Sequence, residues 1–310
     1  MIDILLATYN GEKYLIQQLD SILDQSFNQW RVLVRDDGSS DRSCAILKEY
    51  QKKFPNQFHI ISCELGNVGI LQNFLLLMQY SEAPYVMLCD QDDIWKPNKI
   101  SLTLQAMKEA ESISFNKLPI LVHTDLQVVD ERLNVLNKSF WHYQHINPYL
   151  DSYNRLLVQN TVTGCTVMIN RALLNLAIPI PSQVIMHDWW LALVASSFGK
   201  IVVLEEQTML YRQHGNNDTG AKEWSLVYVV KKALTLFNRT ELLRSIRLTQ
   251  LQAEVFYNRF SQQLTNNQKG VIVGYIGLEK KNRVFRALFL FRNRLLKQGV
   301  IRNIALFIRI

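Results

Sequence analysis

Apolar and polar segments alternate along the first part of the chain in a way that predicts strands separated by helices. Residues 2–7 form a continuous apolar run, which is typical of a strand buried on both faces. Across residues 12–24, Leu15, Leu19, Ile22 and Leu23 recur at helical spacing and share one face. We expect further strands at 32–34, 59–62 and 85–89, with helices at about 42–53 and 69–80.

The pattern becomes less regular after residue 98. A helix through Met107 is expected to lead to a strand at 120–123 and then to the irregular aromatic stretch WHYQHINPY. A strand at 163–169, a helix at 188–197 and a strand at 201–204 complete the expected elements. Strands joined by helices of this length predict an α/β fold with βαβ units, a mostly parallel sheet and helices on both faces.

Polar clusters follow three of the expected strands. TYNGE comes after the first, RDDGSSD after the second and DQDD after the fourth. In open α/β sheets, ligands bind in the crevice outside the carboxyl ends of the parallel strands. The sequence therefore predicts one ligand site to which all three clusters contribute.

Composition and charge divide the chain into two parts. Residues 1–224 carry 18 Lys and Arg against 24 Asp and Glu, whereas residues 225–310 carry 16 against 3. The excess behind the net charge of +7 therefore belongs entirely to the C-terminal part. With 48% apolar residues the chain is expected to fold, and it shows neither a signal peptide nor an uncharged run long enough to span a membrane.

The four cysteines, Cys44, Cys63, Cys89 and Cys165, lack the paired spacing of a zinc site or a disulfide framework. We interpret them as buried small apolar residues in a reducing compartment. Neither a GxGxxG fingerprint nor a P-loop is present, which argues against a dehydrogenase of the Rossmann class and against a P-loop kinase.

Asp90, Asp92 and Asp93 form the densest acidic cluster. Carboxylates this close repel one another unless a cation or hydrogen bonds compensate them. At the end of a buried strand they predict a site for Mg²⁺ or Mn²⁺, which would take its remaining ligands from water and substrate phosphate. The structural alternative is a solvated turn that caps the helix beginning near Pro97.

Asp36 and Asp37 end the second expected strand. One carboxylate there is suited to accept the imide N–H of a uracil or thymine ring, while Asp37-Gly38 with the following serines also suits a turn and helix cap. Further along, Asp188 lies between His187 and the pair Trp189-Trp190. This combination predicts a general base beside indole rings that stack on a sugar, or alternatively a helix cap with core tryptophans.

Arg212 and His214 provide a cation and an imidazole, which suits a departing diphosphate or its metal. The structural alternative is an ordinary loop. Taken together, seven ordered motifs over roughly residues 2–220 resemble the family 2 glycosyltransferases: ATYNGEKYL, VRDDGSSD, GNVGILQNF, LCDQDDIW, TGCTVMINR, HDWW and YRQHGNN. The combination of QDDIW, HDWW and YRQHGNN is most similar to bacterial rhamnosyltransferases of cell-wall, capsular and O-antigen polysaccharide synthesis.

The resemblance implies a GT-A catalytic domain at 1–224, with a nucleotide-binding half at about 1–97 and an acceptor half at about 98–224. It implies nucleotide-sugar binding by Thr8, Tyr9, Glu12, Asp36, Asn67, Asn73, Asp90, Gln91 and Arg212. It further implies Asp92 and His214 as metal ligands, Asp188 as the catalytic base, and Gly164, Cys165, His187, Trp189 and Trp190 on the acceptor side. Because Asp93 adjoins Asp92, either carboxylate remains a candidate ligand for Mn²⁺ or Mg²⁺.

The activity implied is inverting transfer of a sugar from a nucleoside diphosphate to a hydroxyl of a glycan or polyprenyl-linked saccharide. The expected donor is dTDP-β-L-rhamnose, and the alternative is a UDP-hexose or UDP-N-acetylhexosamine. A sugar-nucleotide pyrophosphorylase is disfavoured because MIDILLATYNGEKYL lacks a Gly-rich basic loop. An inactive glycan-binding module is disfavoured because Asp92 and Asp188 are both present.

Residues 225–310 are expected to form a basic amphipathic helical region. It either packs on the catalytic domain or lies on an anionic membrane surface with its apolar side chains buried. We expect the second arrangement, with the protein in the cytoplasm and peripheral on the inner face of the cell membrane. No nucleic-acid-binding motif accompanies the basic residues, so no nucleic-acid partner is expected.

Overall fold

The computed structural model describes residues 1–62, 66–114, 118–215 and 239–309. Its strands are β1 (Ile2–Thr8), β2 (Trp30–Asp36), β3 (Phe58–Ser62), β4 (Tyr85–Cys89), β5 (Ile94–Trp95), β6 (Ile120–Val129), β7 (Val135–Asn137), β8 (Met168–Asn170) and β9 (Lys200–Arg212). Its helices before residue 216 are α1 (Glu12–Leu23), α2 (Ser43–Lys53), α3 (Ile70–Tyr80), α4 (Lys99–Ser114), α5 (Phe140–Gln144), α6 (Tyr153–Leu156), η1 (Gly164–Thr166), α7 (Arg171–Ala177) and α8 (His187–Phe198). The C-terminal helices are α10 (Arg239–Phe260), α11 (Asn266–Ile276), η2 (Gly277–Lys280), α12 (Arg283–Arg292) and α13 (Val300–Arg309).

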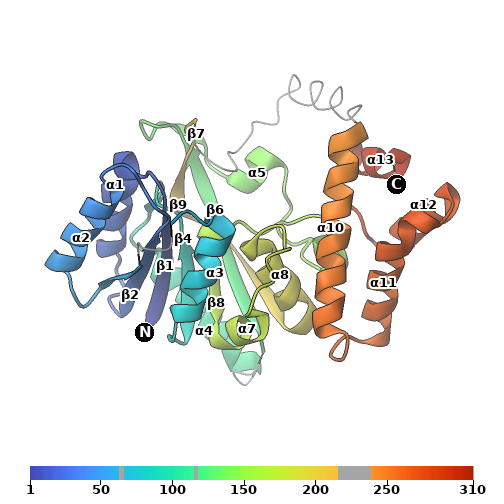
Figure 1. The fold of residues 1–310 in the computed structure, drawn as a ribbon, viewed down its shortest axis with the longest axis horizontal. Helices are drawn as coiled ribbons and strands as arrows, with labels where there is room; N and C mark the ends of the chain where they lie inside the picture. Colours follow the sequence, from blue (N-terminus) through green and yellow to red (C-terminus); the bar gives the residue numbers. More distant parts are fainter. Residues whose placement is uncertain (63–65, 115–117, 216–238, 310) are drawn as a thin grey trace.

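One sheet organises the chain in the strand order β3-β2-β1-β4-β8-β6-β9-β5, with β7 paired to β6. The four neighbouring strands β3, β2, β1 and β4 are parallel to one another, and β9 is parallel to β6. β8 runs antiparallel between β4 and β6. Helices cover both faces of the sheet (Figure 1). The α/β fold predicted from the sequence is therefore confirmed.

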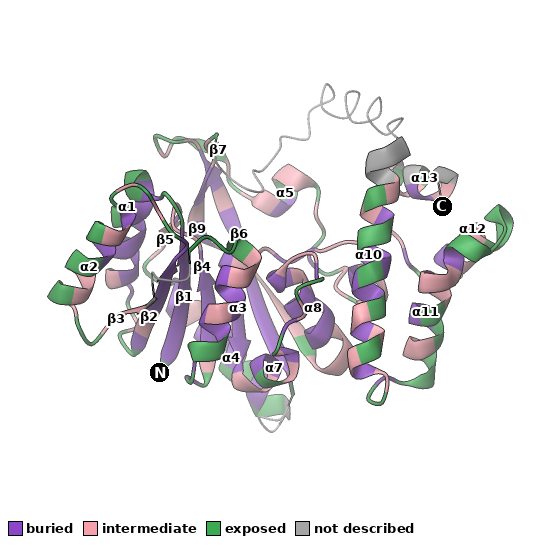
Figure 2. Cartoon of the chain, viewed as in Figure 1, coloured by how far each residue is buried: buried purple, intermediate pink, exposed green. Residues whose placement is uncertain are grey.

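The sheet separates two hydrophobic cores, because side chains along a strand alternate between its faces. In β1, Ile4 and Leu6 pack with the apolar faces of α1, α2 and α4. Leu5, between them, packs on the opposite side with residues of α3, α7 and α8. Figure 2 shows β1, β2, β4 and β6 buried along most of their length. This double burial explains why residues 2–7 are apolar without interruption.

Several elements differ from the sequence prediction. β6 continues to Val129 where a strand at 120–123 was expected, and β5, β7, α5, α6 and α7 were not foreseen. The strand expected at 163–169 is replaced over Gly164–Thr166 by the 3₁₀ turn η1, where Val167 N donates to Gly164 O at 3.1 Å, and only β8 remains. The strand expected at 201–204 is extended into β9, which continues to Arg212 beside β6 and β5. Pairing with a long neighbour, rather than local apolar pattern, sets the length of β9.

The C-terminal helices pack on the sheet-bearing part through aromatic side chains. Phe256 and Phe260 of α10 contact Trp190 of α8, with ring centroids 5.6 and 5.9 Å apart. The end of the expected basic helical region forms two helices, α12 and α13, and the positive φ angles of Arg294 (54°) and Gly299 (84°) lie in the break between them. The predicted boundary near residue 224 lies outside the described residues. Within the described ranges, every helix is too short or too polar to cross a bilayer.

Candidate active site

The register of the parallel strands brings the polar motifs to one edge of the sheet. Thr8 pairs with Asp36 across β1 and β2, and Leu6 pairs with Cys89 across β1 and β4. A cavity of about 510 Å³ opens at this edge. It is lined by Ala7, Thr8, Tyr9, Asp37, Asn67, Gly69, Ile70, Asn73, Asp90, Gln91, Asp92, Met186 and Tyr211. Most of the residues expected to bind the nucleotide-sugar are thus brought together.

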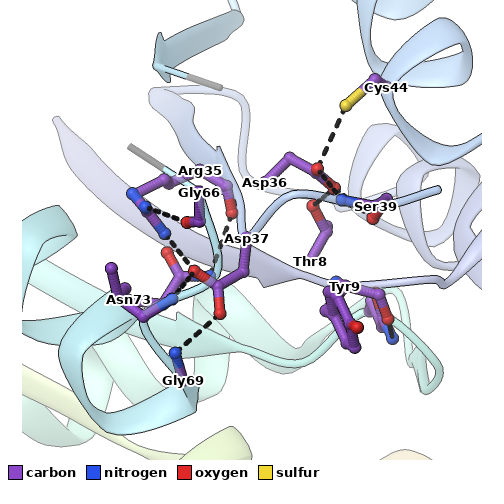
Figure 3. A network of polar contacts seen from close by, with 12 residues as sticks. Thr8, Tyr9, Arg35, Asp36, Asp37, Ser39, Cys44, Gly66, Gly69 and Asn73 are labelled. Atoms are coloured by element: carbon purple, nitrogen blue, oxygen red, sulfur yellow. Dashed lines mark hydrogen bonds and ion pairs between the residues drawn. The ribbon is translucent and has the colours of Figure 1, made fainter. Parts of the chain in front are cut away.

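Asp36 lies behind the cavity wall and not on it. Its side chain is fully buried and accepts hydrogen bonds from Thr8 Oγ1 at 2.8 Å and from both the backbone N–H and the hydroxyl of Ser39 (Figure 3). The thiol of Cys44 donates to the same carboxylate at 3.1 Å. These donors occupy the oxygens expected to read a pyrimidine base. The geometry gives Asp36 the role of joining the end of β1 to the turn after β2.

Asp37 lines the cavity that Asp36 does not reach. Its carboxylate pairs with the buried guanidinium of Arg35 at 2.6 Å and accepts the backbone N–H groups of Val68 and Gly69 (Figure 3). Asn73 donates to Arg35 O at 3.2 Å from the next helix. Arg35 and Asp37 therefore hold the Gly66–Gly69 loop against the cavity. No local signal in the sequence indicates this role for Arg35.

Gln91 closes the first loop of the site. Its Oε1 accepts from Tyr9 N and its Nε2 donates to Tyr9 O, both at 2.8 Å. A Cβ on Gly11 would overlap the carboxamide of Gln91, so the glycine leaves room for this pair of bonds. Glu12, expected at the nucleotide, instead accepts from Arg42 N at 2.8 Å and does not line the cavity. Gln91 thereby couples the DQDD segment to the TYNGE loop.

The three carboxylates of the acidic cluster have different surroundings. Asp90 and Asp92 line the cavity, and Asp92 Oδ2 lies 2.8 Å from His214 Nε2. Asp93 is fully buried, and one of its oxygens accepts from Arg212 N at 3.1 Å. Burial, together with the neighbouring Asp92 and Asp90, raises the pKa of Asp93 well above its usual value. Asp92 is therefore the better placed of the two candidate metal ligands.

The donor set at the cavity suits a hard or borderline divalent cation. The Asp92 carboxylate suits both Mn²⁺ and Mg²⁺, which keep positions for water and phosphate, whereas the imidazole of His214 in contact with it suits Mn²⁺ better than Mg²⁺. Behind them, the closest ligand atoms of Asp90, Asp93 and Cys165 lie within 4.8 Å of one another. That second group includes a thiol whose pKa burial raises well above its usual value, which disfavours it as a thiolate ligand.

Lys99 supplies a buried positive charge beneath the acidic cluster. Its ammonium donates to Cys165 O at 3.0 Å and to Thr208 Oγ1 at 3.3 Å, and its side chain is fully buried. Burial lowers the pKa of Lys99 to about 8. A lysine at the start of a helix gives no sequence signal of burial, so this residue was missed.

Arg212 has a structural position that differs from its expected one. Its guanidinium donates to Asp92 O at 2.9 Å, to Glu131 O at 3.0 Å and to Gln17 Oε1 at 2.6 Å. The side chain is buried and does not line the cavity. Arg212 therefore holds the backbone of Asp92 in place. Its proposed contact with a departing diphosphate stays a prediction.

Asp188 lies in the first turn of α8, beside η1. Trp189 N donates to its Oδ1 at 2.6 Å and Asn160 Nδ2 donates to its Oδ2 at 3.2 Å. A Cβ on Gly164 would lie 3.7 Å from Asp188 Oδ2, so the turn packs directly on the carboxylate. Burial raises the pKa of Asp188 to about 6, whereas these donors partly offset that rise. Asn160 was not foreseen, because nothing near it in the sequence marks it.

The aromatic residues around Asp188 are placed differently from one another. Trp190 is fully buried among Phe256 and Phe260 and so belongs to the core. Trp189 is partly exposed, and its indole N–H donates to Leu156 O at 2.6 Å. His187 packs on Phe74 at 4.2 Å between ring centroids, and burial lowers its pKa to about 3. Of the two tryptophans, only Trp189 is exposed enough to meet a sugar.

The sequence of the chain is similar to those of known proteins. The family model described as "Glycosyl transferase family 2" matches residues 3–175. The dTDP-rhamnosyl transferase RfbG of Shigella flexneri is 26% identical over 289 residues, which cover 88% of this chain and 90% of RfbG. The putative teichuronic acid biosynthesis glycosyltransferase TuaG of Bacillus subtilis (strain 168) is 27% identical over 255 residues, covering 80% and 92%.

A solved structure extends the likeness to the fold. The crystal structure of residues 1–349 of S. aureus TarS in complex with UDP-GlcNAc matches with a TM-score of 0.57 and 17% identity, over 99% of this chain and 90% of that one. The GT-A fold expected from the sequence is confirmed by this match. Together with the family model, which spans more than half of the chain, it leads to one conclusion: the chain belongs to glycosyl transferase family 2.

Proposed function

We propose that the protein is an inverting, metal-dependent glycosyltransferase of surface-polysaccharide synthesis. One observation carries this proposal: the η1 turn places a carboxylate with a raised pKa next to the acidic strand end. Cys165 lies close to Asp90 and Asp93, and the preceding Gly164 packs on Asp188. A proton acceptor and a group of anionic ligands are thus held on two sides of one turn, as sugar transfer from a nucleoside diphosphate requires.

Asp188 acts as the general base. Its pKa of about 6 keeps it ionised at neutral pH while leaving it basic enough to take a proton from an acceptor hydroxyl. The bonds from Trp189 N and Asn160 Nδ2 fix the direction of the carboxylate. As the acceptor oxygen forms its bond to the anomeric carbon, the bond to the nucleoside diphosphate breaks on the opposite side. A single displacement of this kind inverts the anomeric configuration.

Asp92 and His214 would hold the divalent cation, Mn²⁺ or Mg²⁺. A cation bound there would supply positive charge against the negative charge that develops on the departing diphosphate. Arg212 supports this site from behind, because its side chain donates to Asp92 O. Thr8, Tyr9, Asn67 and Asn73 line the cavity and are proposed to contact the nucleotide-sugar.

The proposed donor is dTDP-β-L-rhamnose, which gives an α-L-rhamnoside. Its support is the likeness to RfbG, whose name specifies a dTDP-rhamnosyl transferase, over nearly the whole chain. The second candidate is a UDP-hexose or UDP-N-acetylhexosamine, supported by the fold shared with TarS, whose structure holds UDP-GlcNAc. The acceptor is a hydroxyl of a glycan or of a polyprenyl-linked saccharide at the cytoplasmic face of the membrane.

A donor comparison tests the proposal. The thermal midpoint is measured with Mn²⁺ and either dTDP-rhamnose, UDP-glucose, UDP-galactose or UDP-N-acetylglucosamine, in the wild type and in Asp92→Asn. Stabilisation grows with ligand concentration over its dissociation constant, so the preferred donor gives the largest shift. The shift should require the metal and should be lost in Asp92→Asn. A UDP-sugar shift larger than that of dTDP-rhamnose would overturn the rhamnose assignment.

Turnover separates an enzyme from an inactive glycan-binding module. Release of the nucleoside diphosphate is measured with the preferred donor and a mixture of saccharide acceptors. Metal-dependent release that disappears in Asp188→Asn supports catalysis, because Asp188 has no proposed contact with the donor. If the wild type binds the donor but releases no nucleoside diphosphate, either with any of the saccharide acceptors or with water alone, the result would favour an inactive glycan-binding module.

A further inference from the structure

α12 is held firmly against the rest of the C-terminal helices by one of its faces. Leu290 is fully buried in the core, and Phe289 lies on Gly274 of α11, where a Cβ would overlap its ring. Arg286 donates from its guanidinium to Lys281 O and to Glu279 O, each at 2.6 Å. These contacts fix which side of α12 faces the protein, and the opposite side therefore faces outward.

The outward face of α12 is apolar. Val284, Leu288 and Phe291 are spaced as i, i+4 and i+7, so they share one side of the helix, and they are 71%, 63% and 69% exposed. Phe285, at the border of this side, is 45% exposed. We call these four residues the α12 stripe. Exposed apolar side chains are ordinary when single, but a stripe on one helix face marks a contact surface.

Basic side chains surround the α12 stripe. Lys280, Lys281, Arg283, Arg292 and Arg294 are exposed around the helix and at its two ends. The sequence contains no Asp or Glu from residue 280 to residue 310. The adjacent acid, Glu279, lies 3.7 Å from Arg247 in an exposed ion pair. The surface around the stripe is therefore positive with no acid of its own segment to neutralise it.

We propose that the α12 stripe is a docking surface for an anionic lipid bilayer, with the helix lying parallel to the membrane plane. Apolar side chains would enter the boundary between headgroups and acyl chains, while Lys and Arg pair with anionic headgroups. This inference rests on the proposed function, whose acceptor lies at the cytoplasmic face of the membrane, and it assigns contact with that membrane to the ten residues of α12 instead of the whole C-terminal region.

Charge and size both favour a bilayer over a second copy of the chain. Two α12 stripes in contact would bring two positive surfaces together, which costs free energy. Four side chains also offer little area compared with the roughly 1,200 Å² or more that a stable protein interface buries. α12 lies at the end of the molecule farthest from α2 and β3, and among the residues that the structure describes none covers its green, exposed outer face (Figures 1 and 2).

Vesicle flotation of the full chain without donor or metal tests the inference. The wild type is expected to float with an equal mixture of phosphatidylglycerol and phosphatidylcholine, and to remain soluble with phosphatidylcholine alone. Leu288→Glu/Phe291→Glu should weaken binding by about tenfold or more, because each large apolar side chain loses its burial. The matched control, Ile16→Glu/Ile113→Glu, changes residues that are 47% and 76% exposed on other helices and should float like the wild type.

Thermal midpoints within a few degrees of the wild type show that both double variants fold. Equal flotation of the two double variants would overturn the inference, and so would a wild type that stays soluble with the anionic vesicles. A wild-type dimer in solution that Leu288→Glu/Phe291→Glu converts to a monomer would assign the stripe to self-association instead. Because flotation is measured without donor, its failure is distinct from a failure of the proposed transfer activity.

Discussion

The strand-end site and the α12 surface use charge in opposite ways. At the strand end, Arg35 and Asp37 are both almost fully buried, and each is paired with the other and with backbone groups. At the start of α12, Arg283 and the preceding Lys281 are exposed, and no acid of their own segment neutralises them. The buried charges hold the backbone of the site in place, whereas the exposed charges remain available to attract an anionic partner.

The difference predicts how each region responds to substitution. A buried charge is costly once its partner is removed, because water cannot replace the lost contact. An exposed charge is already solvated and can be removed with little effect on stability. Substitutions at the strand end should therefore change stability or transfer strongly, whereas substitutions on α12 should change only binding to a surface.

The largest effect is expected for Asp188→Asn. Loss of the general base should lower the rate of transfer by about 10²–10⁴-fold, measured as nucleoside diphosphate release at saturating donor. The raised pKa means that the ionised carboxylate costs folding free energy at neutral pH. The variant should therefore unfold at a higher temperature, with a gain of up to about 3 kcal/mol at pH 7.

Asp3→Asn provides the matched control. Asp3 is also buried, but Arg31 pairs with it and its pKa is lowered, so its ionised form stabilises the fold. That variant should lose stability at pH 7 while keeping its transfer rate per folded molecule. Loss of stability in both variants would contradict the environment assigned to Asp188.

The second effect is on folding. Arg35→Met leaves the Asp37 carboxylate buried without its cation, which should lower the free energy of unfolding by about 3–5 kcal/mol. Urea denaturation at neutral pH measures the change. Lys13→Met removes an exposed pair with Glu131, whose side chains are 64% and 49% exposed, and should change the free energy of unfolding far less than Arg35→Met does. Equal losses would remove the distinction between the two regions.

A smaller effect follows from pH. With a pKa of about 6, Asp188 is protonated below that value and cannot accept the hydroxyl proton. Transfer per unit of enzyme should fall about tenfold for each pH unit below the pKa. Stability depends on pH in the opposite direction to the transfer rate. Because the folded pKa of Asp188 lies above its unfolded value, the stabilising contribution of Asp188 is greatest below the unfolded pKa and is lost as pH rises through about 6. A rate that is flat between pH 5 and 7, with chemistry limiting, would contradict the assignment.

The smallest effect on stability is expected on α12. Arg283→Gln removes an exposed charge and should change the free energy of unfolding by less than about 0.5 kcal/mol. The same change should weaken binding to anionic vesicles by severalfold and make that binding less sensitive to salt. Destabilisation well above this limit would show that the basic residues of α12 hold the fold together.

The sequence predicted the strand-end site because two local signals agreed. Apolar runs such as residues 2–7 identify buried strands, and parallel pairing brings their ends to one edge, as Thr8 and Asp36 show. The partners of buried charges were not predictable in this way. Lys99 and Arg212 look like surface residues in the sequence, and only the packing of distant segments buries them. For the same reason the resemblance assigned Asp36 to the nucleotide whereas Asp37 lines the cavity: which carboxylate faces the cavity depends on how the turn after β2 folds.

The α12 surface was predictable only in outline. Its basic, apolar composition indicated an amphipathic helix, but the contact between Phe289 and Gly274 decides which face is outward. Similarly, the stretch around Gly164 is as apolar as a strand, but η1 forms there, where Gly164 packs against His187 and Asp188 of α8. Tertiary contacts override local propensity at both places.

The bonds between Gln91 and the backbone of Tyr9 constrain how this site can be altered by directed evolution. Any side chain at residue 11 would displace the carboxamide of Gln91 and break both bonds, so a library that randomises Gly11 or Gln91 would consist mainly of damaged loops. Asn67, Ile70 and Met186 line the same cavity without taking part in that pair of bonds. Diversity introduced at those three residues should explore donor preference while leaving the entrance to α1 intact.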